Sequence, residues 1–228
     1  MRHSAADAGI ARLPGLAAGR EATVTGQVLA VAGAAMRLIL PVVLLAVTGL
    51  AAFLYSNVPV SWIVGPGDGW LTMGQALLPL TFLAVHLTNR RYGPGYAFAQ
   101  VIATWILGGF VFQFVHAQLA QFAGVALPAT REAIGFSLGL LAAQLAAVFV
   151  FDRTRGPRWW SGPLFGSLWG AAVLCFVAYP AAYAGTDADW VNQMFVNLWL
   201  AAAAAVALLI PYWLFRPIVQ PLSGFNGY

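Results

Sequence analysis

Residues 79–96 of the chain read PLTFLAVHLTNRRYGPGY. An apolar run ends in this stretch, and a pair of arginines and a Gly-Pro-Gly turn follow it directly. A run of this kind that stops at paired arginines is typical of a membrane-spanning helix reaching the cytoplasmic surface. The stretch also places one ionisable side chain, His86, inside the apolar run. It therefore predicts a membrane span, its direction and a first candidate site residue.

The composition of the whole chain agrees with a membrane protein. Of its 228 residues, 61% are hydrophobic and only 8% are charged, whereas a soluble domain has about 25% charged residues. So few charges cannot cover a surface that faces water. All eleven basic residues are arginines, and they fall beside apolar runs, which favours a role in topology over nucleic-acid binding. We expect a polytopic membrane protein that contacts the lipid bilayer and does not bind nucleic acid.

Six apolar runs are long enough to cross a bilayer, which takes about 20 residues. The segments between them are too short for a separate soluble domain. The sequence therefore predicts an all-α membrane domain of six transmembrane helices over residues 37–216. It follows a partly disordered cytoplasmic extension over residues 1–36 and precedes a cytoplasmic tail over residues 217–228. The predicted spans are residues 38–55, 70–87, 96–118, 131–151, 162–183 and 191–215.

The arginines set the predicted orientation. Ten of the eleven fall on one side of the predicted spans, and only Arg131 falls on the other. Because positive charge is enriched in cytoplasmic loops, both termini are predicted to be cytoplasmic. Tryptophans beside the fourth loop fit the aromatic belt of a membrane interface. The residues that we assign to topology and the interface are Arg90, Arg91, Arg153, Arg155, Arg158, Trp159 and Trp160.

Polar side chains inside the spans are the candidate site residues. Burying an ionisable group in a bilayer is costly, so His86 is either functional or a neutral histidine bonded to a neighbour near the interface. Gln113 and His116 are three residues apart and would share a helix face, either lining an outward cavity or bonding to other helices. Gln75, Asn89 and Asn197 could contact a ligand or hold helices together.

Motifs for catalysis are missing from the sequence. It contains no phosphate-binding glycine loop, no metal-binding histidine pair at helical spacing and no nucleophile elbow. The single cysteine, Cys175, lies in an apolar run. We therefore expect neither an enzyme nor a bound metal or other cofactor.

Five short motifs, spread over residues 37–215, resemble the queuosine precursor transporter family, also called the vitamin uptake transporter (VUT) family. The resemblance implies six helices, similar to the substrate-binding subunits of energy-coupling-factor transporters, in the inner membrane of a bacterium. It also implies uptake of 7-deazaguanine compounds, which are precursors of queuosine. The matching pieces are SNVPV (56–60), LPLTFLA with NRRYG (78–84 and 89–93), VFDR (150–153), RWWSGP (158–163) and SLWG (167–170).

The chain departs from the family at its polar positions. The family usually has an aspartate where this chain has Val85 and His86, and Ser-Asp-Thr in a segment where it has only apolar residues and Cys175. A family lysine falls near Ala201, and an acidic position falls near Asn197. Losing hydrogen-bond partners weakens discrimination steeply, so the ligand is expected to be less polar than a deazaguanine.

Two functions remain open. In the first, the chain is a transporter or its binding subunit and holds a small heteroaromatic ligand with His86, Asn89, Gln75 and Asn197. This reading requires a cavity of roughly 300 Å³ or more. It places that cavity between the second, fifth and sixth helices. In the second, apolar side chains fill the old pocket, and the chain is a non-transporting structural or accessory subunit of a larger membrane complex.

Overall fold

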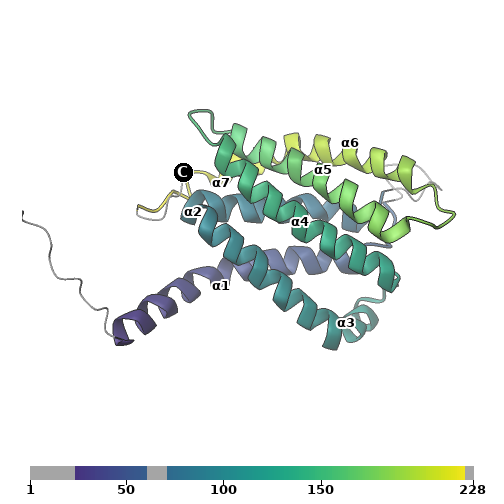
Figure 1. Ribbon diagram of the computed structural model, residues 1–228, viewed down its shortest axis with the longest axis horizontal. Coiled ribbons are helices and arrows are strands. Elements are labelled where there is room, and N and C mark those ends of the chain that lie inside the picture. Colours follow the sequence, from purple (N-terminus) through teal and green to yellow (C-terminus); the bar gives the residue numbers. More distant parts are fainter. Residues whose placement is uncertain (1–23, 61–70, 224–228) are drawn as a thin grey trace, which may run out of the picture. The chain divides into compact units, whose positions relative to one another are not determined.

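The computed structural model describes residues 24–60 and 71–223 (Figure 1). Over these residues the chain is helical, and its only β-type pairing is an isolated bridge between Pro59 and Thr72. The predicted all-α class is thus confirmed, whereas most of the predicted N-terminal extension and the last residues of the tail lie outside the described residues. The helices are α1 (Val24–Leu54), α2 (Met73–Phe114), α3 (His116–Ala123), α4 (Thr130–Thr154), α5 (Ser161–Tyr183), α6 (Trp190–Ala207) and α7 (Leu209–Phe215).

Five helical stretches are long and apolar enough to cross a membrane. The chain is therefore a multi-pass membrane protein by length and composition of its helices. It divides into two units, residues 1–37 and 38–228, and the packing described below lies within the second. The five stretches are Val31–Leu54, Met73–Phe114, Thr130–Thr154, Ser161–Tyr183 and Trp190–Phe215.

Helix α2 contains two of the six predicted spans. A straight helix of 42 residues would be about 63 Å long, twice the thickness of a bilayer core. It is kinked at Gly93, whose φ of 79° and ψ of 177° are open to glycine and costly for other residues. Pro94 also keeps the residue before it out of the helical region. The kink divides α2 into a first limb (residues 73–92) and a second limb (residues 94–114), as Figure 1 shows.

The two limbs fold back on each other. Ala84 and Val85 of the first limb lie in the same core cluster as Ala97 and Val101 of the second. The sequence predicts a polar loop over residues 88–95, but residues 88–92 are helical, so Arg90 and Arg91 lie on the last turn of the first limb. Counting the limbs separately gives six apolar segments, in agreement with the six predicted runs.

The ends of two other helices differ from the predicted spans, whereas a third helix agrees. Helix α1 begins at Val24, well before the predicted start at residue 38. The predicted third span continues to residue 118, but the helix ends at Phe114, and α3 begins in a new direction after Val115. The fifth span, predicted over residues 162–183, is found as α5 (Ser161–Tyr183).

Helices α4 and α5 pack closely through small residues. A Cβ atom on Gly139 would lie 2.6 Å from the Cβ of Ala178, and one on Gly135 would lie 2.8 Å from the backbone nitrogen of Ala182. Ala143 and Ala147 continue this small-residue face of α4 and are fully buried. Small residues of this kind let two helix backbones approach closely inside a membrane.

The arginine-rich segments meet at one end of the bundle. Arg90 donates from Nε to the carbonyl of Val219 at 3.0 Å, and the amide of Leu222 donates to the carbonyl of Arg91 at 3.0 Å. The guanidinium of Arg216 lies 5.4 Å from the ring centre of Trp159, in the connection between α4 and α5. At the opposite end, Arg131 donates to the carbonyls of α5's last turn. The first of these ends is the one that the sequence predicts to be cytoplasmic, and the orientation stays a prediction.

Candidate ligand-binding cavity

His86 is held in the core between α2 and α5. Its Nε2 lies 2.9 Å from the Oγ of Ser167, and its ring stacks on Phe151 with 5.1 Å between ring centres. A Cβ atom on Gly166 would lie only 2.8 Å from the imidazole. The side chain is 1% exposed and does not line the cavity described below. This arrangement matches a histidine bonded to a neighbouring helix.

Two other candidates also bond to nearby backbone. Asn89 donates from Nδ2 to the carbonyl of Val148 on α4 at 3.3 Å, and it is fully buried. Asn197 donates to the carbonyl of Gln193, one turn earlier on its own helix, at 2.9 Å. Gln113 is exposed on the last turn of α2. None of the three lines the cavity described below.

Gln100, which the sequence reasoning missed, links the second limb of α2 to α1. It is fully buried and donates from Nε2 to the carbonyl of Pro41 at 2.9 Å. An amide near the start of an apolar run was the signal that could have identified it.

The space between the first limb of α2 and α5 is filled. A Cβ atom on Gly170 would clash with the ring of Phe82, and Leu174 packs in the same core cluster as Phe82. Ala171 is buried beside them. These contacts occupy part of the region where the sequence predicts a chamber lined by His86, and the cavity described below lies elsewhere.

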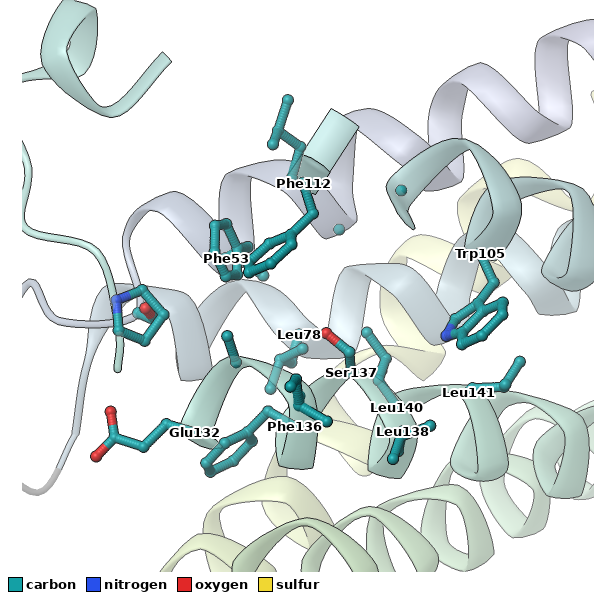
Figure 2. A pocket seen from close by; sticks show the side chains of 18 of the residues that line it. Phe53, Leu78, Trp105, Phe112, Glu132, Phe136, Ser137, Leu138, Leu140 and Leu141 are labelled. Atoms are coloured by element: carbon teal, nitrogen blue, oxygen red, sulfur yellow. The ribbon is translucent and has the colours of Figure 1, made fainter. Parts of the chain in front are cut away.

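A cavity of about 620 Å³ lies instead between α1, both limbs of α2 and α4 (Figure 2). Its volume falls within the range of small-molecule sites, about 300 to 1,000 Å³. Most of its wall is apolar, and aromatic rings stand on two sides. Phe53 and Phe112 meet edge to face with 5.8 Å between ring centres, and Phe136 faces the cavity from α4.

Polar side chains gather at the end of the cavity that is opposite the arginine-rich end of the bundle. They come from the ends of six elements, including the starts of α2, α3 and α4. Figure 2 shows Glu132 at this end and the indole of Trp105 at the other. Gln75 and His116, two of the predicted site residues, are both here. The polar residues of this end are Ser56, Asn57, Thr72, Gln75, His116, Glu132, Tyr183 and Gln193.

Several of these groups already have partners. The Oε1 of Gln75 accepts from the amide of Thr72 at 2.8 Å, and its Nε2 donates to the hydroxyl of Tyr179 at 3.4 Å. The Oε2 of Glu132 accepts from the amide of Ala129 at 3.2 Å. These bonds belong to the N-terminal caps of α2 and α4, so the fold itself fixes where both side chains point.

Three polar atoms on the cavity wall have no hydrogen-bond partner among the described residues. They are the Oγ of Ser56, the Oγ1 of Thr104 and the Nδ1 of His116, and each is buried. The imidazole of His116 is held in place by stacking on Phe112 at 4.6 Å between ring centres. Because an unpaired buried polar atom is costly, these three are the groups that a bound ligand would satisfy.

The described residues contain no group of three His, Cys, Asp or Glu side chains that could hold a metal ion. Cys175 is buried in the core cluster of α5 and α6 and does not line the 620 Å³ cavity. The chemistry available in the cavity is thus hydrogen bonding, aromatic contact and one carboxylate.

The helices and the cavity define a class: a polytopic α-helical membrane protein with a ligand-sized cavity between its helices. Comparison of the chain with protein-family models, curated proteins and solved structures found no match. The resemblance to queuosine precursor transporters therefore stays a prediction.

Proposed function

We propose that this chain is a membrane transport protein, or the binding subunit of one, that holds a small and mainly apolar ligand between α1, α2 and α4. The strongest support is the 620 Å³ cavity, whose mostly apolar wall carries three polar atoms without a partner among the described residues. A cavity of this size fits a compact organic molecule.

The ligand class follows from the wall. Phe53 and Phe112 offer aromatic edges and faces to a planar ring, and such contacts contribute about 0.5 to 1.5 kcal/mol beyond burial. Ser56 and His116 offer hydrogen bonds at the polar end of the cavity, and Thr104 offers one elsewhere on its wall. A small heteroaromatic compound with few polar groups fits this pattern better than a deazaguanine does. This agrees with the loss of polar residues from α5.

The direction of transport follows from the predicted orientation. The polar end of the cavity is opposite the arginine-rich end, so it would open toward the outer face of a bacterial inner membrane. A ligand arriving from outside would meet the polar groups first and then the apolar body of the cavity.

A matched pair of glycines tests the proposal. Gly108 lines the cavity and Gly95 does not, yet both lie on the second limb of α2, and a Cβ atom at either would meet nothing within 4 Å. Protein extracted from native membranes in lipid particles should carry a small-molecule adduct in native mass spectrometry. Gly108→Phe should remove the adduct by filling the cavity, and Gly95→Phe should retain it.

Two outcomes would contradict the proposal. The first is an adduct that survives Gly108→Phe, because the ligand would then lie elsewhere. The second is a protein that carries no adduct and instead migrates as part of a larger assembly. That result would favour the alternative of a non-transporting accessory subunit.

A further inference from the structure

A second hollow, of about 570 Å³, lies at the arginine-rich end of the bundle. It is formed by the last turns of the first limb of α2, by α7 and by the segment that follows α7. Its wall is basic and apolar, and no acidic side chain among the described residues lines it. The lining residues are Arg90, Trp213, Leu214, Arg216, Pro217 and Gln220.

Arg216 supplies a positive charge that is not paired with a carboxylate in the described part of the chain. Its guanidinium lies over the ring of Trp159, and its Nε is buried without a hydrogen-bond partner there. Asp152 pairs with Arg155 at 2.7 Å, so that carboxylate is already occupied. A buried guanidinium nitrogen without an acceptor among the described residues is a donor that an anionic group would satisfy.

Arg90 is fixed beside it. The bond from its Nε to the carbonyl of Val219 holds the guanidinium against the segment after α7, and the bond from Leu222 to the carbonyl of Arg91 anchors that segment a second time. The side chain of Arg90 also hydrogen-bonds to the hydroxyl of the buried Tyr212. Two arginines thus converge on one hollow whose walls are held by backbone bonds.

The outer side of the hollow is apolar and exposed. Trp213 is 54% exposed and Leu214 is 56% exposed, and both belong to the last turn of α7. Tryptophan is enriched at the depth of lipid headgroups, and arginines at the cytoplasmic surface attract anionic lipids. The hollow thus combines arginines that suit a lipid headgroup with exposed apolar side chains that suit an acyl chain.

We propose that this hollow binds the phosphate of an anionic phospholipid headgroup. Arg216 and Arg90 would donate to the phosphate oxygens, and the acyl chains would lie along Trp213 and Leu214. Guanidiniums suit this role because their planar donors match phosphate oxygens in pairs. The inference concerns a different surface from the ligand cavity and does not depend on the proposed function.

The test uses the whole protein in lipid particles and measures quenching of tryptophan fluorescence by brominated lipids. Brominated phosphatidylglycerol should quench more strongly than brominated phosphatidylcholine with the same chains, and the difference should largely disappear in Trp213→Phe. Arg216→Gln should lower the relative affinity for phosphatidylglycerol about fivefold, which corresponds to one lipid-facing charge of about 1 kcal/mol. The matched control is Arg153→Gln, which removes the same charge at the same end but outside the hollow.

Three results would overturn the proposal. Equal quenching by the two lipids in the wild-type protein would show that no headgroup is selected. Equal losses in Arg216→Gln and Arg153→Gln would show a general charge effect. Displacement of the brominated lipid by millimolar inorganic phosphate would show a site for free phosphate. Because the comparison of lipids and Trp213→Phe leave both arginines in place, the test does not depend on Arg216→Gln folding.

Discussion

Small residues have opposite effects at the two faces where other helices lie beside α4. On the side of α5, Gly135 and Gly139 leave no room even for a Cβ atom. On the side of α1 and the second limb of α2, Gly49, Gly108 and Gly109 face open space and border the 620 Å³ cavity. The first side, which we call the closed side of α4, is an interface that holds the bundle together. The second side, which we call the open side, borders the candidate binding cavity. A glycine in an apolar run therefore allows close packing only where a second helix lies against it.

The strongest test of this contrast is a bulky residue on each side. Gly139→Leu should destabilise the protein by about 3 kcal/mol, the upper end of overpacking costs, because Ala178 approaches with backbone as well as side chain. Thermal unfolding in detergent would measure it. Gly108→Leu is the control and should unfold at or slightly above the wild-type temperature, since leucine favours the helix. A wild-type midpoint for Gly139→Leu would mean that α4 and α5 are less closely packed than described.

His86 belongs to the closed side, although its burial in a span suggested a ligand site. His86→Ala should cost about 2 to 3 kcal/mol, because it leaves a void against Phe151 and an unpaired hydroxyl on Ser167. Equilibrium unfolding would show this loss, while the ligand occupancy of each folded molecule should stay unchanged.

The reverse result is expected for His116, on the open side. His116→Phe keeps a ring against Phe112 and removes the nitrogen that faces the cavity, so ligand occupancy should fall with little change in unfolding. If His86→Ala abolished ligand binding in a protein that remains folded, the assignment of the two histidines would be reversed.

The spans could be predicted from the sequence, and the division into closed and open sides could not. Length and apolar content fix α5 to within one residue, because a buried run between a basic loop and Gly185 has clear ends. Gly93-Pro94 predicts a turn, yet the helix continues through Arg90 and Arg91 up to it. Arginines at a membrane surface can stay helical since their side chains reach the headgroups.

The site residues were harder to predict because polar side chains serve both sides of α4. Asn89 and Gln75 are both amides in one limb, but Asn89 bonds to α4 and Gln75 borders the cavity. Which role each takes depends on the helix that faces it, and a single sequence does not contain that information.

Gly93 tests the turn that brings the two limbs of α2 together. Gly93→Ala should cost about 1 to 2 kcal/mol, because a Cβ atom is unfavourable at φ 79°. Gly95→Ala, two residues on and with open space around it, should be neutral or slightly stabilising. The difference between the two unfolding midpoints isolates the conformational cost, and identical midpoints would show that residue 93 can adopt another conformation.

The smallest effect is expected at Gln100, whose side-chain amide bonds the second limb of α2 to α1. Gln100→Leu removes the bond to the carbonyl of Pro41, and bonds of this kind inside membranes contribute about 0.6 kcal/mol on average. It also removes Oε1, a buried acceptor without a partner among the described residues, and this offsets part of the loss. The free energy of unfolding should therefore change by less than about 1 kcal/mol. A loss above about 2 kcal/mol would mean that Oε1 bonds to an ordered water, and that α1 is held as firmly as the closed side of α4.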